Sequence, residues 1–129
     1  MYQFRTTLTK DFETVVSQVT EELKKEGFGV LTEIDFQKTL KAKINKDMRP
    51  YKVLGACNPP LAAQALDIEP NVGLLLPCNV LIKEEEDNRV CVSFLDPMAM
   101  LGLVENTSDL EKFGKDVRGR LERVRDALG

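Results

Sequence analysis

The stretch "GLLLPCNVLIKEEEDNRVCVSFLD", residues 73–96, consists of two apolar runs on either side of an acidic segment. Runs of this length that are rich in apolar and β-branched residues, separated by a few turn-forming residues, predict a β-hairpin. We expect its strands over residues 73–83 and 89–96, joined by the loop "EEEDN" at 84–88. The hairpin determines which side chains share a face of the sheet.

Side chains alternate between the two faces of a strand, so the pattern assigns the hairpin residues to faces. In a register that joins the two apolar sets, Cys78 lies opposite Phe94, and Cys91 lies on the other face. We therefore expect that Cys78 and Cys91 do not form a disulfide bond. The first face should carry Leu74, Leu76, Cys78, Val80, Ile82, Val90, Val92 and Phe94, and the second face Leu81, Cys91, Ser93 and Leu95.

The residues before the hairpin predict three more strands, one long helix and two shorter helical segments. We expect strands over 2–8, 28–36 and 51–57 and a weakly helical, charged segment over 37–48. The long helix should start at Thr9 or Asp11 and end at Gly27, which suits a left-handed C-terminal position. Its buried side is predicted to comprise Phe12, Val15, Val16, Val19 and Leu23.

A short helix is predicted after the third strand, with Asn58 as its N-cap and Pro59 in the first helical position. Pro70 and Gly73 close that segment. A long amphipathic helix is predicted from Ser108 to Leu128. Its apolar stripe is Leu110, Phe113, Val117, Leu121, Val124 and Leu128.

This order of elements indicates an α+β fold, a two-layer sandwich in which two long helices cover one face of a mixed or antiparallel sheet. The 129 residues are the usual length of one domain, so we expect a single domain over residues 1–129. No internal repeat, linker or low-complexity tract interrupts the chain.

Charge and hydropathy exclude two classes of partner. Lys and Arg number 18 against 21 Asp and Glu, which gives a net charge of −3 and no positive field for nucleic acid. The longest apolar stretch, residues 72–82, is interrupted by Pro77 and Asn79 and is too short to span a membrane. The N-terminus does not resemble a secretion signal, and three cysteines fit a reducing compartment, so we expect a cytoplasmic protein.

The residue types present exclude several kinds of chemistry. The chain has no histidine, so Cys–His catalysis, Ser–His–Asp triads and mixed Cys/His zinc sites are excluded. The three cysteines match no zinc spacing, and the acidic loop at 84–88 lacks the glycine turn and alternating ligands of a calcium loop. We expect neither a metal nor a cofactor.

Two short segments contain the candidate ligand-binding residues. The first comprises Cys57, Asn58 and Pro59, and the second comprises Pro77, Cys78 and Asn79. Cys57 shares a face with Cys78 if Tyr51, Val53 and Gly55 point inward, but the alternative set Leu54 and Ala56 is nearly as apolar, so the pairing stays open. A free cysteine most often packs as a small hydrophobic residue. The helix after Cys57 would favour a thiolate, yet Pro59 and Pro60 remove two of its N–H donors.

Two classes of function are consistent with these features. The first is a homodimeric binding or interaction module without catalysis, whose second sheet face or inter-subunit cleft takes a small ligand or a partner. That surface would include Leu75, Pro77, Asn79, Leu81 and Leu95. The alternative is a thiol-dependent enzyme or redox protein that uses Cys78 with Cys57, although no general base is identifiable near either thiol. The first class is favoured, because no group is available to activate the thiol.

Several segments carry a resemblance to a known family. "KKEGFGVLTEID" (24–35), "RPYKVLGA" (49–56), "GACNPPLAAQAL" (55–66), "EP" (69–70) and "GLLLPCNVLIKE" (73–84) resemble the family catalogued as domain of unknown function 302. Its most specific pieces here are Asn58-Pro59 and Pro77-Cys78. The resemblance implies a two-layer α+β fold of the TATA-binding-protein-like type and a homodimer, with no established activity, substrate or catalytic residue. DNA binding does not follow from such a fold, because function lies in sites and this chain is acidic overall.

Overall fold

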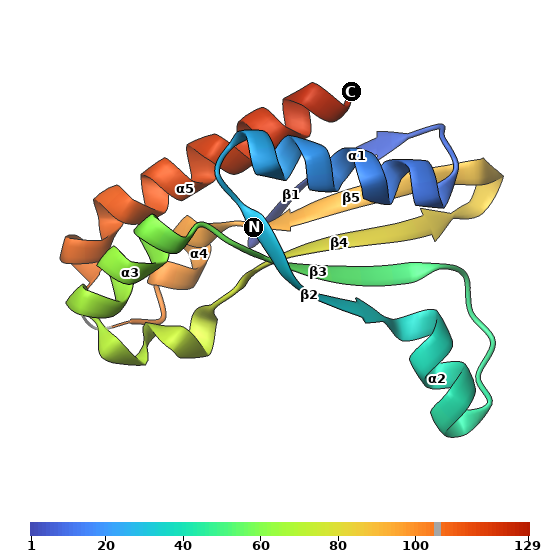
Figure 1. The fold of residues 1–129 in the computed structure, drawn as a ribbon, viewed down its shortest axis with the longest axis horizontal. Helices are drawn as coiled ribbons and strands as arrows, with labels where there is room; N and C mark the ends of the chain where they lie inside the picture. Colours follow the sequence, from blue (N-terminus) through green and yellow to red (C-terminus); the bar gives the residue numbers. More distant parts are fainter. Residues whose placement is uncertain (105–106) are drawn as a thin grey trace.

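The computed structural model describes residues 1–104 and 107–129, and its centre is a five-stranded antiparallel sheet (Figure 1). The strands lie in the order β1-β5-β4-β3-β2, and every neighbouring pair is antiparallel. The two-layer α+β prediction is confirmed, while the TATA-binding-protein-like topology stays a prediction. The strands are β1 (Gln3–Leu8), β2 (Gly29–Asp35), β3 (Tyr51–Cys57), β4 (Cys78–Glu85) and β5 (Arg89–Leu95).

Two long helices, α1 (Phe12–Lys25) and α5 (Thr107–Leu128), cover the same face of this sheet (Figure 1). Of the two N-caps considered for α1, the structure uses Asp11, whose carboxylate accepts hydrogen bonds from Thr14 N at 3.0 Å and Thr14 Oγ1 at 2.6 Å. The chain leaves α1 at Gly27, with φ of 87°. Because this conformation is unfavourable for residues with a Cβ, glycine ends the helix as expected.

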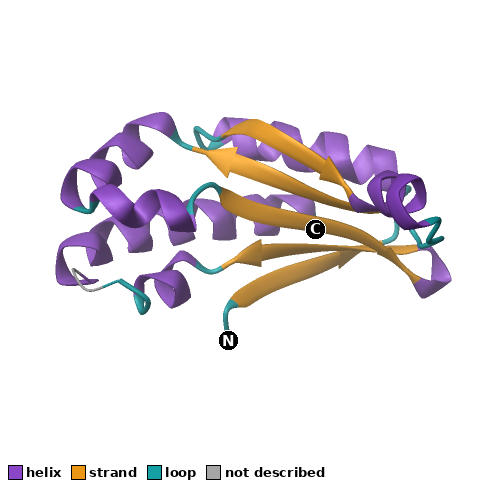
Figure 2. Ribbon diagram, turned by 90° about the horizontal axis from the view of Figure 1, so that it is seen from below, coloured by secondary structure: helices purple, strands orange, loops and turns teal. Residues whose placement is uncertain are grey.

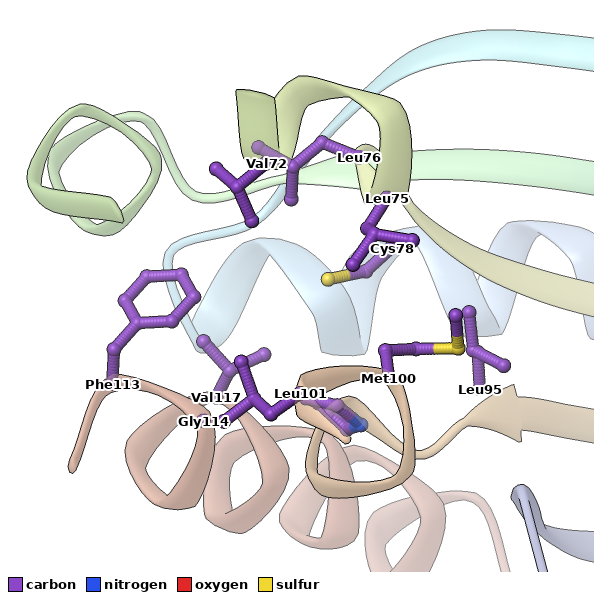
Figure 3. Close-up of a pocket in the computed structure, with 11 residues that line it drawn as sticks. Val72, Leu75, Leu76, Cys78, Leu95, Met100, Leu101, Phe113, Gly114 and Val117 are labelled. Atoms are coloured by element: carbon purple, nitrogen blue, oxygen red, sulfur yellow. The ribbon is translucent and has the colours of Figure 1, made fainter. Parts of the chain in front are cut away.

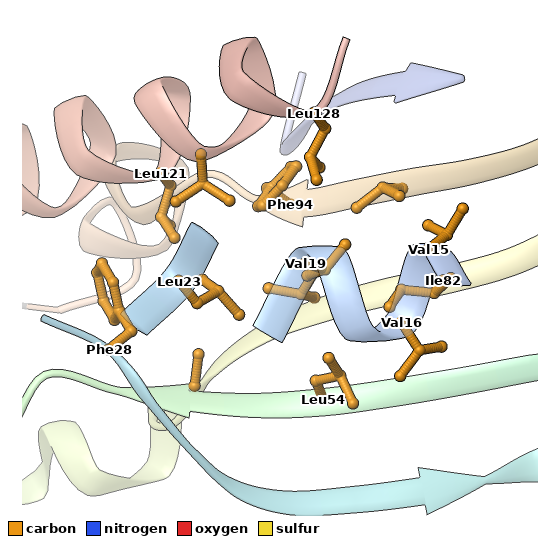
Figure 4. Close-up of a cluster of buried hydrophobic side chains, with 14 of the residues drawn as sticks. Val15, Val16, Val19, Leu23, Phe28, Leu54, Ile82, Phe94, Leu121 and Leu128 are labelled. Carbon is orange, nitrogen blue, oxygen red and sulfur yellow. The ribbon is translucent and has the colours of Figure 1, made fainter. Parts of the chain in front are cut away.

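The core lies between the sheet and these two helices (Figure 4). Val15, Val19 and Leu23 of α1 are completely buried there. The predicted stripe of α5 is also buried, apart from Phe113, which is half-buried. Burial of each such side chain stabilises the fold by about 1.5–3 kcal/mol. The sheet contributes Leu54, Ala56, Val80, Ile82, Val90, Val92 and Phe94.

The predicted register of the hairpin is wrong by two residues, although the predicted faces are correct from Cys78 onward. Val80 lies opposite Phe94, and Cys78 pairs with Ala56 of β3 rather than with Phe94. The turn is shorter than expected, because β4 continues to Glu85 and only the 3₁₀ turn η2 (Glu86–Asn88) remains. Asp87 and Asn88 both adopt left-handed conformations, which Asp and Asn tolerate better than other residues with a Cβ.

The predicted first strand of the hairpin also starts too early. Residues Pro70–Leu75 form a 3₁₀ helix, η1, in which Leu76 N donates to Gly73 O, and the Leu76–Pro77 peptide is cis. Strand β4 begins at Cys78, so the predicted alternation does not extend to Leu74 and Leu76. Pro77 cannot take part in a β-ladder as a donor, since it has no N–H.

Three further helices complete the described part of the chain. Helix α3 (Pro59–Ile68) starts at Asn58 as predicted. Helix α4 (Pro97–Leu101) was not predicted; the Asp96 carboxylate caps it by accepting from Met98 N at 2.9 Å. Helix α2 (Phe36–Ile44) confirms the weakly helical segment and ends at Asn45 in a left-handed conformation.

Helix α2 projects from the sheet on the side opposite to α1 and α5 (Figures 1 and 2). It is fully described and contains no buried residue. Figure 2 shows that, among the described residues, no helix lies along this second face of the sheet. We call this surface the open face. The side chains that alternate with the core residues form it, including Val53, Leu81, Cys91, Ser93 and Leu95.

Gly55 is required where β2, β3 and the start of β4 approach one another. A Cβ at this position would collide with Thr32 Oγ1 and lie 2.8 Å from Pro77 Cγ. Thr32 follows an irregularity in the pairing of β2 with β3, which places it directly opposite Gly55. The absence of a side chain at Gly55 therefore lets Thr32 and Pro77 pack together over β3.

We expect Gly55→Ala to lower the free energy of unfolding by about 1–3 kcal/mol, because the added methyl group overpacks this contact. Urea unfolding monitored by circular dichroism measures the change. Gly29→Ala is the matched control, since a Cβ there has no described atom within 4 Å, and it should change stability by less than about 0.5 kcal/mol. Equal effects of the two substitutions would contradict this interpretation.

Candidate functional site

The two segments that contain the candidate site residues lie together at one end of the sheet. Strand β3 ends at Cys57 where β4 begins at Cys78, with Ala56 opposite Cys78 and Gly55 opposite Asn79. The six candidate residues are therefore neighbours, although about 20 residues separate the two segments in the sequence. Pro59 and Asn79 are exposed, while Cys57, Pro77 and Cys78 are half-buried and Asn58 is buried.

The two cysteines belong to alternate sets of side chains in the sheet, yet both line one small cavity that Asn58 also lines. Cys78 packs against the core together with its partner Ala56. Cys57 follows Ala56 in the strand, so it belongs to the alternate set, and Leu54 with Ala56 is the inward set. Cys57, Cys78 and Cys91 are all free thiols. Cys91 is buried on the open face, opposite Lys83 and Thr7, which confirms its separation from Cys78.

Asn58 connects two helices through hydrogen bonds of its side chain. Its side-chain oxygen accepts from Leu61 N at 3.3 Å, which caps α3, and its Nδ2 donates to Glu26 O at 3.5 Å. The same Glu26 carbonyl accepts from an Arg120 side-chain nitrogen at 2.9 Å. Asn58 thereby connects the start of α3 to the end of α1, and a Cβ on Gly27 would lie only 2.8 Å from its Nδ2.

Cys78 faces a narrow apolar crevice between η1, α4 and α5. Figure 3 shows its sulfur pointing into the space between side chains from η1 on one side and from α4 and α5 on the other. The crevice measures about 40 Å³, and a second cavity of about 20 Å³ lies beside Asn58 and Phe28. Leu76, Cys78, Phe113 and Val117 line both. The crevice is also lined by Val72, Leu75, Leu95, Pro97, Met100, Leu101 and Gly114.

Much of this crevice was not expected from the sequence. Phe113 and Val117 were assigned to the buried stripe of the last helix, and only the structure shows that they also line a cavity. Met100 and Leu101 belong to α4, which the prediction missed. The signal for α4 was Asp96-Pro97, which repeats the cap-and-proline pattern of Asn58-Pro59.

The surroundings of Cys78 keep its thiol protonated. Burial raises the pKa of Cys78 to about 11, and the nearby Cys57 adds to the shift. None of the described residues that line the crevice is charged, so no cation stabilises a thiolate there. Since the thiolate is the nucleophilic and metal-binding form, this environment disfavours thiol chemistry at Cys78.

A family model for the domain of unknown function DUF302 matches residues 4–128. The chain belongs to the DUF302 family. Among solved structures, it is similar to the crystal structure of an uncharacterised conserved DUF302 protein from Bacillus stearothermophilus, with a TM-score of 0.92 and 26% sequence identity. That similarity covers 100% of this chain and 99% of the other. No curated protein matches the chain.

The described residues of this DUF302 chain contain neither a cluster of metal ligands nor a membrane-spanning helix. Within residues 1–104 and 107–129, no three Cys, Asp or Glu side chains are grouped so that they could hold a metal ion. No helix in the same residues is long and apolar enough to cross a membrane.

We expect Cys78 to react with iodoacetamide at least about 100-fold more slowly than a fully exposed thiol at neutral pH, because a pKa two units above 9.0 reduces the thiolate fraction by that factor. The rate should rise with pH until about pH 11. Mass spectrometry of peptides from briefly labelled, folded protein measures it for each cysteine. Cys57 is the internal control, and labelling of Cys78 faster than Cys57 would contradict the packed environment.

Proposed function

We propose that this DUF302 protein is a binding module without catalysis, which forms a homodimer through its open face and holds a small ligand in the crevice beside Cys78. The observation that carries the proposal is the apolar centre of the open face. Ile34, Val53 and Leu81 are paired in a row across β2, β3 and β4. A row of three large apolar side chains on a face without a helix cover supports a protein contact there.

The distribution of charge supports a second copy as the partner. Helix α2 and the residues after it carry Lys38, Lys41, Lys43 and Lys46, whereas the tip of the β4–β5 hairpin carries Glu84, Glu85, Glu86 and Asp87. Both segments lie at the same end of the sheet, where Arg49 donates from its side chain to Glu85 O at 3.2 Å. A two-fold contact needs a self-complementary surface, and a chain with both a basic and an acidic element provides one.

Helix α2 adds a structural argument for this contact. It projects beyond the open face without burying any residue, and Ile44 at its end is 66% exposed. Most helical stability in proteins comes from packing of an apolar side. A partner copy against the open face would supply such packing for α2.

The alternative, a thiol-dependent enzyme or redox protein using Cys78 with Cys57, receives less support. The raised pKa of Cys78 and the uncharged crevice disfavour a nucleophile. We retain the cytoplasm as the proposed location, supported by three unbridged thiols. A nucleic-acid partner is not proposed, because the net charge is −3.

Light scattering at micromolar concentration should give twice the 14.5 kDa mass of the chain. Leu81→Asp should weaken the dimer at least about 100-fold, because it places an unpaired carboxylate in the apolar contact. Leu66→Asp is the matched control, since Leu66 is 42% exposed on α3 and lies outside the open face. A wild-type monomer at all concentrations, or equal effects of both variants, would refute the homodimer.

A further inference from the structure

The crevice beside Cys78 and a groove on the surface lie on either side of Leu75. An open groove of about 320 Å³ is lined by Glu69, Asn71, Leu74, Leu75, Leu103 and Val104. Leu75 lines both the groove and the crevice. Leu74 is 89% exposed and Leu103 is 71% exposed, so two large apolar side chains face solvent beside the entrance. A wide groove with exposed leucines therefore adjoins the narrow apolar crevice at Leu75.

The width of the crevice selects the shape of an occupant. A protein cavity that accepts benzene measures about 150 Å³, whereas this crevice measures about 40 Å³. A ring therefore does not fit without displacing the walls, while the last carbons of an unbranched chain do. The remaining carbons of such a chain have room in the groove, which is several times larger.

The lining selects the chemistry of the occupant. Cys78 is the most polar side chain among the described residues of the crevice, and a polar group placed there would lose its hydrogen bonds to water. The groove carries one charged residue among its described lining, Glu69, whose carboxylate accepts from Asn71 N at 3.1 Å. A carboxylate head group would be repelled by Glu69, but an alcohol or an amine would not.

We propose that the crevice and groove bind an unbranched alkyl chain with an uncharged or cationic head group. The terminal carbons of the alkyl ligand lie beside Cys78, between Leu76, Phe113 and Val117. The rest of the alkyl chain passes Leu75 and lies in the groove. The head group lies near Glu69. This inference rests on the proposed ligand-binding function and specifies its ligand class.

The test is a titration of isotope-labelled protein with hexan-1-ol, octan-1-ol and decan-1-ol, followed by nuclear magnetic resonance. Resonances of Leu75, Leu76, Cys78 and Phe113 should shift. Affinity should rise about fourfold for each added methylene that becomes buried, as the transfer of a methylene from water predicts. Decylamine should bind at least as tightly as decan-1-ol, and decanoate at least about tenfold more weakly.

Two variants test the path of the alkyl chain from the groove past Leu75 into the crevice. Leu75→Trp should block the passage between groove and crevice and abolish the increase of affinity with chain length, whereas Leu66→Trp on α3 should not. Because Leu75→Trp can disturb folding, Leu74→Glu is the second variant. Leu74 is almost fully exposed, so this variant should fold normally and weaken decanoate more than decylamine.

The outcomes separate the ligand class from the ligand-binding function itself. Toluene shifting the crevice resonances while decan-1-ol does not would overturn the alkyl class and leave a ligand site at the crevice. No shift at the crevice with any of these probes would overturn both. Decan-1-ol shifts on the open face alone, or affinities unchanged in both variants, would overturn the proposed route.

Discussion

The structure depends on helices covering one face of the sheet and not the other. Helices α1 and α5 bury the alternate residues of β3, β4 and β5, so the position of each residue in its strand determines its environment. Leu54, Val80 and Val92 are in the core, while their neighbours Val53, Leu81 and Ser93 form the open face. The separation of Cys78 from Cys91 follows from the same alternation. The proposed function follows as well, because it places the dimer contact on the face without helices.

The end of the sheet where β3 and β4 meet combines tight packing with a small void. On one side of the sheet the packing is tight, because Thr32 and Pro77 occupy the space beside Gly55. The side chain of Asn58 connects α3 to the end of α1 through hydrogen bonds. On the other side, η1 and α4 approach α5 without filling the space around Cys78. A Cβ on Gly114 would lie 2.5 Å from Leu101 Cδ1 and 3.0 Å from Met98 Sδ, so the absence of a side chain there lets the side chains of α4 pack directly against α5. The crevice is thus bounded by η1, α4 and α5, and its described lining carries no charged side chain.

Local signals predicted the elements well, and non-local packing was harder to predict. Asp11, Gly27 and the Asn58-Pro59 pair act within one turn of the backbone, so α1 and the start of α3 could be placed from the sequence. The hairpin register could not, because it depends on the left-handed conformations of Asp87 and Asn88. Of the candidate site, the six residues beside the β3–β4 pairing were predicted. The crevice was not, because residues from η1, α4 and α5 come together only in the folded chain.

A homodimer through the open face would bring methyl groups of two copies together, and contacts between copies measure this arrangement most directly. A mixture of ¹³C-labelled and unlabelled protein gives isotope-filtered nuclear Overhauser effects that arise only between copies. We expect such effects for the methyl groups of Ile34, Val53 and Leu81. Effects confined to the outer surfaces of α1 and α5, or none at concentrations where the protein is dimeric, would contradict it.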